Sequence, residues 1–311
     1  MEKNICIIVP GYGSCPTLKN CLHSLCQVDY PNFEIIFVDD GLEDTALTVL
    51  ESFKDKINIL KSNSKGPSFA RNLAAKQTAA DFLAFTDSDC IVPKNWLSEL
   101  LKGLEKFTSA ASCGGRQEIP DDATDFEKQI FAFFKKTGFI TDYMRKTANK
   151  GLQEVEHNAS CNVLYRRDIF LKSGGFLEEL WPGEDVEIDY KLRKMGHQLI
   201  FNPNSLVYHY RPKNLKSFLK MMFRYGWAQG FLVKRYGLFR KIQLLPFLSL
   251  LTLILFILSL ILKKFVPLLI ISGSGIIFLF IYLTFNIQFI YLTLLGFIYW
   301  NIGFFKKFLG R

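Results

Sequence analysis

Two carboxylates, Asp87 and Asp89, are separated by one residue directly after the apolar run of residues 82–86. A run of that length and composition is typical of a buried strand, so both side chains can point into one small volume at its end. Hard divalent cations such as Mg²⁺ and Mn²⁺ take one or two protein carboxylates and complete their shell with substrate phosphates. The pattern predicts a metal site, with a solvated turn as the alternative.

A second acidic pair, Asp39 and Asp40, closes the apolar run of residues 35–38. If these strands belong to a parallel sheet, that position is where a nucleotide presents its base or ribose. The alternative, a turn or helix cap, suits Asp40 better than Asp39. We therefore expect Asp39 to contribute to a nucleotide site.

Residues 65–72 have the pattern of a helix N-terminus, with Pro67 in the first turn. Unpaired N–H groups and Arg71 would then face the same end of the sheet as the two acidic pairs. Arg71 is either a clamp for a base or phosphate, or an ordinary surface arginine.

Glu184 and Asp185 open a predicted helix that stops at Gly196. A carboxylate at this place can act as general base toward a hydroxyl nucleophile. Complementing the helix dipole explains one of the two, but hardly both. His209, after the last predicted strand, is a third metal ligand, a diphosphate contact or a structural histidine.

These residues need a scaffold of alternating strands and helices. Strand-like runs alternate with amphipathic stretches through the first half of the chain, which predicts an α/β fold with a mostly parallel sheet and ligands at the carboxyl ends of its strands. The expected strands are residues 5–9, 34–39, 57–60, 82–86, 162–165 and 199–201, and the expected helices are near 16–27, 44–54, 67–79 and 184–195.

The last third of the chain differs in composition. Residues 211–311 hold 14 of the 38 lysines and arginines and no acidic residue, whereas residues 1–210 carry a net charge of −5. An acidic first part argues against a nucleic-acid partner, and basic residues beside apolar runs favour anionic lipid head groups. We expect three parts: a domain at 1–212, an amphipathic membrane-interface segment at 213–242, and hydrophobic helices at 243–311.

Three apolar runs, at about 244–262, 265–285 and 287–305, approach the roughly 20 residues that span a bilayer. Three full spans that start from a cytoplasmic domain would put Lys263, Lys264, Lys306, Lys307 and Arg311 outside, against the positive-inside rule. A re-entrant or in-plane first segment followed by one hairpin of two spans would keep all of them inside. Both topologies remain open, and both predict a multi-pass membrane protein with a cytoplasmic first domain.

The seven cysteines lack the spacing of a zinc knuckle or a disulfide scaffold, so we expect reduced thiols in the cytosol. The apolar run at residues 5–9 is shorter than the core of a signal peptide. Both observations agree with a cytoplasmic first domain.

Taken in order, these motifs resemble the inverting glycosyltransferases of family 2, which have the GT-A fold. The resemblance covers residues 4–210. It rests on Ile-Val-Pro at 8–10, Val-Asp-Asp-Gly at 38–41, Gly66 with Ala-Arg-Asn at 70–72, Asp-Ser-Asp at 87–89, residues 162–167, Gly-Gly-Phe at 174–176 and Gly-Glu-Asp at 183–185.

The resemblance implies that Asp39 and Arg71 contact the nucleobase, that Asp87 approaches the ribose and the metal, and that Asp89 binds Mg²⁺ or Mn²⁺. It also implies that Asp185 deprotonates the acceptor hydroxyl. The motifs add nucleotide-sugar contacts at Pro10, Asp40, Gly66 and Ser88, and an acceptor or donor-sugar region at Asn162, Trp181 and Glu184. The expected partners are a nucleoside diphosphate sugar, first of all a UDP-sugar, a lipid-linked glycan acceptor and membrane lipids.

The sequence also departs from the family pattern. The usual Val-Tyr-Asn after the first proline is Gly11-Tyr12-Gly13, and the Gln-x-x-Arg-Trp signature of processive members is missing. We therefore expect one sugar per acceptor. The alternatives are transfer to polyprenyl phosphate, a nucleotidyltransferase, and a membrane scaffold with an inactive domain; Pro16 stands where a dinucleotide fingerprint requires glycine, which argues against an oxidoreductase.

Overall fold

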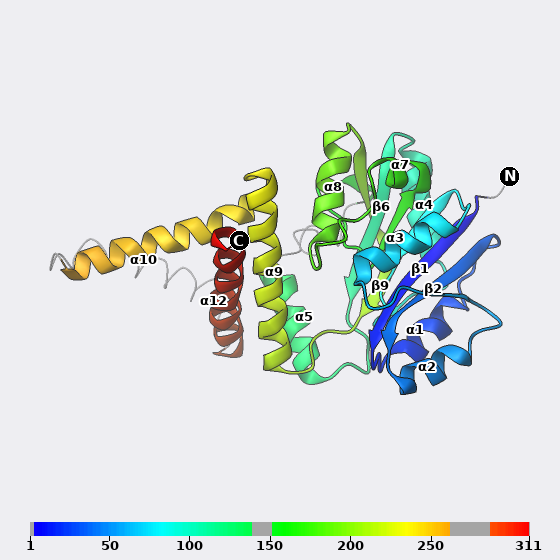
Figure 1. The fold of residues 1–311 in the computed structure, drawn as a ribbon, viewed down its shortest axis with the longest axis horizontal. Coiled ribbons are helices and arrows are strands. Elements are labelled where there is room, and N and C mark those ends of the chain that lie inside the picture. The colour runs from blue at the N-terminus through cyan, green and yellow to red at the C-terminus, as the bar shows by residue number, and fades with distance from the viewer. Residues whose placement is uncertain (1–2, 139–150, 262–286, 311) are drawn as a thin grey trace. The chain divides into compact units, whose positions relative to one another are not determined.

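The computed structural model of the protein describes residues 3–138, 151–261 and 287–310. It divides the chain into two compact units, Met1–Arg211 and Pro212–Arg311, which are described separately below (Figure 1).

The first unit is built on one sheet with the strand order β3-β2-β1-β4-β8-β6-β9-β5. The first four strands of that order are parallel: β3 (Asn58–Lys61), β2 (Phe33–Leu42), β1 (Ile5–Gly13) and β4 (Phe82–Phe85). β8 (Val163–Arg166) is antiparallel to both β4 and β6 (Ala110–Glu118), and β9 (Gln198–His209) is parallel to β6. Two short strands, β5 (Cys90–Ile91) and β7 (Gln153–Glu154), run antiparallel to β9. The predicted α/β fold is confirmed, with its parallel strands concentrated in the first half.

Helices cover both faces of this sheet, and the central strands therefore bury both of their sides. In β1, Ile5, Ile7 and Val9 pack into one apolar cluster, and the alternating Cys6 and Ile8 pack into another. The first cluster is closed by α1 (Leu18–Leu25), α2 (Asp44–Glu51) and α4 (Trp96–Lys106), and the second by α3 (Pro67–Gln77), α7 (Arg167–Lys172) and α8 (Glu184–Lys194). A further helix, α5 (Asp125–Thr137), begins at a capping box of Thr124 and Glu127.

The second unit contains two helices in backbone contact, α9 (Leu215–Tyr236) and α12 (Ile287–Leu309). A Cβ atom at Gly226 would lie 1.8 Å from the carbonyl oxygen of Trp300, and one at Gly230 would lie 2.3 Å from that of Phe304. Glycines are therefore required where the two helices touch. Because the residue numbers increase together along the contact, α9 and α12 run parallel to each other.

Between these two helices in sequence comes α10 (Leu245–Ile261), preceded by the 3₁₀ turn η1 (Lys241–Leu244). Two polar pairs hold the start of this segment. In η1, Gln243 Nε2 donates to Gln229 Oε1 of α9 over 3.1 Å, and in the first turns of α10, Ser249 Oγ donates to Asn301 Oδ1 of α12 over 2.8 Å. Beyond them, apolar side chains from Leu250 to Leu258 are 41–53% exposed. Among the described residues, one helical stretch, Lys241–Leu258, is long and apolar enough to cross a membrane.

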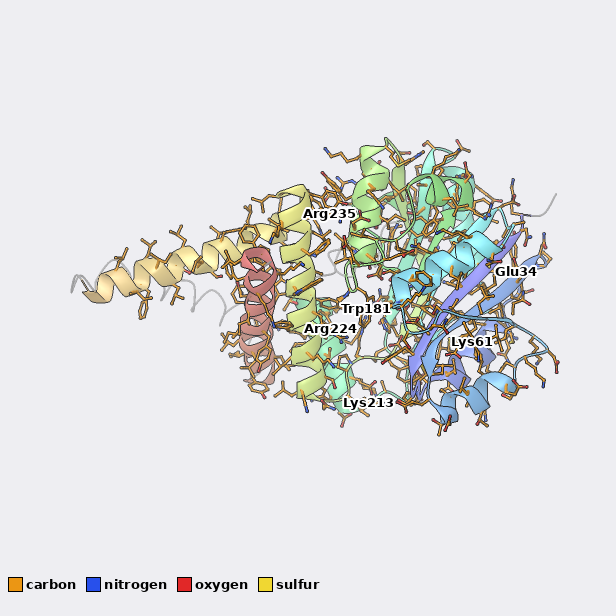
Figure 2. The ribbon with its side chains drawn as sticks, in the orientation of Figure 1. Glu34, Lys61, Trp181, Lys213, Arg224 and Arg235 are labelled. Atoms are coloured by element: carbon orange, nitrogen blue, oxygen red, sulfur yellow. The ribbon has the colours of Figure 1, made fainter. Side chains whose placement is uncertain are left out.

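The three predicted apolar runs thus have different outcomes. The first coincides with α10 and the third lies within α12, whereas the second, at about 265–285, lies outside the described residues. The predicted amphipathic segment contains α9, along which the basic side chains of Arg224 and Arg235 can be followed in Figure 2.

Candidate active site

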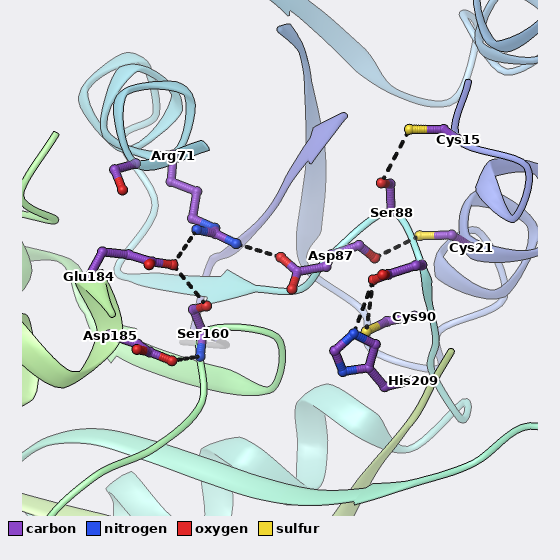
Figure 3. Close-up of polar contacts among 12 residues, drawn as sticks. Cys15, Cys21, Arg71, Asp87, Ser88, Cys90, Ser160, Glu184, Asp185 and His209 are labelled. Atoms are coloured by element: carbon purple, nitrogen blue, oxygen red, sulfur yellow. Dashed lines mark hydrogen bonds and ion pairs between the residues drawn. The ribbon is translucent and has the colours of Figure 1, made fainter. Parts of the chain in front are cut away.

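The Asp87-Ser88-Asp89 loop links two strands, and that connection determines what lies beside it. It leaves β4 and enters β5, whose Cys90 is opposite His209 in the antiparallel pairing with β9. As a result, the Nε2 atom of His209, a residue labelled in Figure 3, lies 3.3 Å from Asp89 Oδ1. One ligand atom from each of Asp87, Asp89 and His209 lies within 4.8 Å of the others. The structure thus brings together all three of the expected metal ligands.

The loop is held in place by its backbone. Thr17 Oγ1 donates to the carbonyl oxygen of Ser88 over 3.1 Å, and the Tyr210 N–H donates to that of Asp89 over 3.1 Å. Cys21 Sγ donates to the carbonyl oxygen of Asp87 over 3.4 Å. Three anchors, two at α1 and one directly after β9, orient the two carboxylates before any ligand arrives, which is the preorganisation that a binding site requires.

The positive charge of His209 and the negative charge of Asp89 stabilise each other. Burial by itself would lower the pKa of His209, but the adjacent Asp89 carboxylate outweighs it and raises the pKa to about 10. Burial likewise raises the pKa of Asp89, and His209 outweighs that effect, so that the pKa is held below its ordinary value. The donor set of two carboxylates and one imidazole fits Mn²⁺ well and Mg²⁺ somewhat less, because Mg²⁺ prefers oxygen ligands.

Arg71 lies elsewhere than the sequence suggested. Its side chain is 2% exposed, and its guanidinium bridges two carboxylates, with Nη2 donating to Asp87 Oδ1 and Nη1 donating to Glu184 Oε1 over 2.8 Å (Figure 3). Burial would lower the pKa of Arg71, but both carboxylates outweigh it, so the group stays charged. It is therefore a buried link between the two acidic motifs and not a surface arginine.

The two aspartates at the end of β2 separate into different roles. Asp40 is buried and accepts hydrogen bonds from Ser62 Oγ and from the N–H groups of Lys65 and Gly66, both over 2.9 Å. Asp39 Oδ1 accepts from the backbone N–H of Leu42 over 2.8 Å, and its Oδ2 accepts no hydrogen bond from the described residues. Asp40 thus fastens the loop that leads into α3, and Asp39 keeps one oxygen for a ligand.

At the N-terminus of α8, the two acidic residues also differ. Glu184 is buried; burial first and then the Asp185 carboxylate raise its pKa to about 7, against the opposing effect of Arg71. Asp185 is 19% exposed; its Oδ1 accepts from the Val186 N–H over 2.8 Å and its Oδ2 from the Ser160 N–H over 3.3 Å. Asp185 is thus the more exposed of the two carboxylates, and Glu184 lies buried next to it.

His157, for which no role was predicted, connects Asp185 with the core. His157 Nδ1 lies 2.9 Å from Asp189 Oδ2, and His157 Nε2 lies 3.8 Å from Asp185 Oδ2. Asp189 is fully buried and also accepts from the Asn158 N–H and the Tyr165 hydroxyl. No sequence motif marks His157, since it is joined to Asp189 only by the packing of its loop against α8.

The remaining predicted residues fall into two groups. Asn162 is fully buried, with Nδ2 donating to the carbonyl oxygens of Arg116 and Ser205 and Oδ1 accepting from Trp96 Nε1, so it ties the sheet together and does not face an open site. Pro10 is likewise buried in β1. By contrast, Trp181, labelled in Figure 2, is 46% exposed just before α8.

Two further predicted positions mark the rim of the site. Gly66 is the N-cap of α3 with φ of 94°, a conformation that favours glycine. Ser88 Oγ lies 3.5 Å from Cys15 Sγ. Sequence reasoning missed Tyr12, which is 69% exposed at the carboxyl end of β1, beside Gly41 and one strand away from Asp39.

With this geometry described, similarity to known proteins can be added. The family model "Glycosyl transferase family 2" matches residues 6–174, more than half of the chain. The chain belongs to glycosyl transferase family 2. The match covers the Asp39–Asp40 pair, Arg71, the Asp87-Ser88-Asp89 loop and Asn162, and it ends before Asp185.

Individual family 2 relatives extend the comparison. Poly(ribitol-phosphate) beta-N-acetylglucosaminyltransferase TarS of Staphylococcus aureus is 37% identical over 109 residues, which are 33% of this chain and 19% of that protein. The chain thus spans about a fifth of that relative. A Methanococcus voltae protein is 23% identical over 265 residues, 78% of each chain, and is named dolichyl N-acetyl-alpha-D-glucosaminyl phosphate 3-beta-D-2,3-diacetamido-2,3-dideoxy-beta-D-glucuronosyltransferase.

Among solved structures, mannosyltransferase PcManGT from Pyrobaculum calidifontis, in complex with GDP-Man and Mn²⁺, superposes with a TM-score of 0.71 at 16% identity. The alignment covers 99% of this chain and 88% of that chain. This likeness demonstrates a common fold.

Proposed function

We propose that this family 2 member is a metal-dependent, inverting glycosyltransferase that moves one sugar from a nucleoside diphosphate sugar to a hydroxyl of a lipid-linked glycan. The observation that carries the proposal is a chain of contacts. It runs from the cluster of Asp87, Asp89 and His209, called the metal-type cluster below, to the candidate base, Asp185. Asp87 is joined by Arg71 to Glu184, and Ser160 Oγ donates to Glu184 while the Ser160 N–H donates to Asp185. One network of contacts thus joins the metal-type cluster to the candidate base.

The donor end of the site uses the cluster of Asp87, Asp89 and His209. A bound Mn²⁺ or Mg²⁺ there would neutralise the charge that grows on the leaving diphosphate. Asp39 Oδ2 is placed to accept a hydrogen bond from a nucleobase or ribose, and the exposed Tyr12 ring is placed to stack on the base. The structures with UDP-GlcNAc and with GDP-Man among the relatives support a nucleotide-sugar donor, with a UDP-sugar as the first to test.

At the acceptor end, Asp185 accepts the proton of the attacking hydroxyl. The bond from the acceptor oxygen to the anomeric carbon forms as the bond from that carbon to the diphosphate breaks on the opposite face. A single displacement of this kind inverts the anomeric configuration. His157 orients Asp185, and Trp181 offers an exposed aromatic face to a sugar ring.

The second unit supports a membrane location. α9 carries lysines and arginines along its length and therefore suits the head-group region, not the hydrocarbon. α12 lies parallel to it in backbone contact, so we infer that both helices lie in the membrane plane. Among the described helices, crossing then falls to α10, and α12 keeps Lys306 and Lys307 beside α9, on the side taken as cytoplasmic.

The acceptor assignment has one specific rival. Transfer to polyprenyl phosphate needs little help from a base, because the attacking oxygen is already ionised. The exposed, apolar α10 fits either lipid acceptor. The name of the Methanococcus relative, with its dolichyl-linked sugar, favours a glycan hydroxyl.

The test is a panel of nucleotide sugars with membranes containing the full chain, with Mn²⁺ or after chelation, scored for released nucleoside diphosphate. Asp89→Ala and Asp185→Asn should both abolish release from the one active donor. Asp168→Asn is the control, because Asp168 is 64% exposed and pairs with Lys172 on the surface of α7. Release of nucleoside diphosphate that survives Asp185→Asn would indicate the phosphate acceptor. No release with any donor and lipid acceptor would refute the proposed glycosyltransferase activity.

A further inference from the structure

Two thiols lie directly behind the metal-type cluster, and nothing in the proposed reaction uses them. Cys90 is 1% exposed and Cys161 is 4% exposed. Their Sγ atoms and a ring nitrogen of His209 all lie within 4.8 Å of one another. His209 therefore belongs to two possible sets of ligands, one with carboxylates in front of it and one with thiols behind it.

The fold holds each of these groups in place. Cys90 is in β5, directly opposite His209 in β9. Cys161 lies in a turn closed by the Asn162 N–H donating to the Ala159 carbonyl oxygen over 3.0 Å, one residue before the fully buried Asn162. Cys90 is thus carried by a strand and Cys161 by a hydrogen-bonded turn next to a buried residue, and together these two elements set the separation of the thiols.

A fourth ligand atom completes the set. Asp89 Oδ1 lies 4.0 Å from Cys90 Sγ and 3.3 Å from His209 Nε2. Zinc binds thiolates at about 2.3 Å and imidazole at about 2.0–2.1 Å in a tetrahedron, so its ligand atoms lie roughly 3–4 Å apart. Cys90, Cys161 and His209 thus lie within reach of one such ion, and Asp89 lies beside Cys90 and His209 as the fourth ligand.

We propose that Cys90, Cys161, His209 and Asp89 form a binding site for a thiophilic divalent cation, Zn²⁺, that excludes the hard cation from Asp87, Asp89 and His209. Because the two sites share His209 and Asp89, an ion bound at one site uses ligands that the other site needs, and only one ion binds at a time. Thiolates select Zn²⁺ over Mn²⁺, and Zn²⁺ also stands above Mn²⁺ in general affinity order. Each thiol gives up its proton when the ion binds.

Binding is tested without reference to the reaction. Purified full-length protein, with its thiols kept reduced, is titrated with Co²⁺ as a spectroscopic substitute for Zn²⁺. Thiolate-to-cobalt charge-transfer absorption should appear, saturate at one ion per chain and vanish when Zn²⁺ is added. It should be lost in Cys161→Ala and retained in Cys26→Ala, a half-buried thiol at the end of α1.

The same variants test whether bound Zn²⁺ excludes the hard cation and so inhibits transfer. This part of the test rests on the proposed function. Zn²⁺ should inhibit Mn²⁺-supported transfer, excess Mn²⁺ should relieve the inhibition, and Cys161→Ala should retain transfer while needing roughly ten- to a hundredfold more Zn²⁺ for the same inhibition. If Cys161→Ala does not fold, Cys90→Ala serves in both measurements.

The outcomes separate the two proposals. No charge-transfer absorption in the wild type, or equal absorption in Cys161→Ala, overturns the zinc site. Equal sensitivity of wild type and Cys161→Ala to Zn²⁺ overturns the exclusion, because zinc then acts through the carboxylates alone. Absence of transfer with every donor refutes the proposed function, and the cobalt titration still decides the zinc site.

Discussion

His157 Nε2 lies 3.8 Å from Asp185 Oδ2, and the other ring nitrogen of His157 is held 2.9 Å from the buried Asp189. A carboxylate that must accept a proton benefits from a neighbour that fixes its rotamer and shares its charge. Because Asp189 accepts three hydrogen bonds from different parts of the core, the imidazole cannot easily turn away.

His157→Ala should therefore lower kcat by roughly tenfold and leave the donor KM nearly unchanged, since positioning of the base affects the chemical step. Steady-state kinetics over a range of pH values provides the measurement, because a merely structural role would not shift the pH profile. His23→Ala, at an exposed histidine of α1, is the control. A rise in KM with constant kcat would assign His157 to binding instead.

Removing the Arg71 guanidinium should have a larger effect on stability. Arg71→Met leaves Asp87 and the buried Glu184 without their shared counter-charge, and breaking a buried pair in this way costs about 3–5 kcal/mol of unfolding free energy. Because Asp87 is 26% exposed, the lower end of that range is expected. Denaturant unfolding measures the loss.

The double variant Arg71→Met/Glu184→Gln separates stability from catalysis. It removes the charges from both buried partners, so most of the lost stability should return, whereas transfer should stay low because Asp87 and the α8 N-terminus are no longer joined. Recovery of both properties together would show that Arg71 matters only for folding.

Sequence reasoning found the carboxylates of the site but left Arg71 open between a clamp for a base or phosphate and a surface arginine. Asp-x-Asp after a buried strand already predicts a metal site, because the position follows from strand polarity alone. Whether Arg71 faces solvent or core depends on Asp87 and Glu184, which lie 16 and 113 residues away in the chain. No local pattern encodes such a contact.

The sequence offered His209 as a third metal ligand, but the strand pairing that brings it to Asp89 could not be predicted. It depends on β5, which has two residues and gives no periodic signal, and on the register that places Cys90 opposite His209. In the second unit, the apolar run at 287–305 satisfied the length of a span, but the glycines that bring α12 against α9 became meaningful only once both helices were placed.

Glu184 should make the stability of the first unit depend on pH. Its pKa is raised from 4.5 to about 7, so between these values the folded state binds more protons than the unfolded state. The contribution of this group is full below about pH 4.5 and falls as the pH rises through 7. Glu184→Gln removes that dependence.

Thermal unfolding of wild type and Glu184→Gln at about pH 5 and about pH 8 measures this effect. The midpoint of the variant should rise relative to that of the wild type as the pH increases. Thr48→Ser, a non-titrating change in α2, should keep a constant offset. An offset for Glu184→Gln that is equally constant would contradict the raised pKa.

Tyr12 should contribute to donor affinity. Its ring is 69% exposed at the carboxyl end of β1, next to the strand that ends in Asp39. Stacking of a base on an aromatic ring is worth about 1–3 kcal/mol, so Tyr12→Ala should weaken nucleoside diphosphate binding by roughly tenfold. Calorimetry with the bare nucleotide measures this, and Tyr12→Phe, which keeps the ring, should bind like wild type.

The contact between α9 and α12 supplies the last prediction. A Cβ at Gly226 would lie 1.8 Å from the carbonyl oxygen of Trp300, so Gly226→Val must push the two helices apart. Overpacking of this kind costs typically about 1–3 kcal/mol, and because the clash is with backbone, the upper end is expected. Lys220→Val, at an exposed position of the same helix, introduces the same side chain without the clash.

If α12 lies in the membrane plane only because α9 holds it there, separating the helices should also change the accessibility of α12. A single cysteine at exposed Ile302, in a chain whose own cysteines are replaced, should react with a membrane-impermeant reagent from the cytoplasmic side when α9 and α12 are paired. Gly226→Val should reduce that labelling, because an unpaired apolar helix of 23 residues is long enough to enter the bilayer. Labelling from the opposite side in the wild type would instead establish α12 as a membrane span.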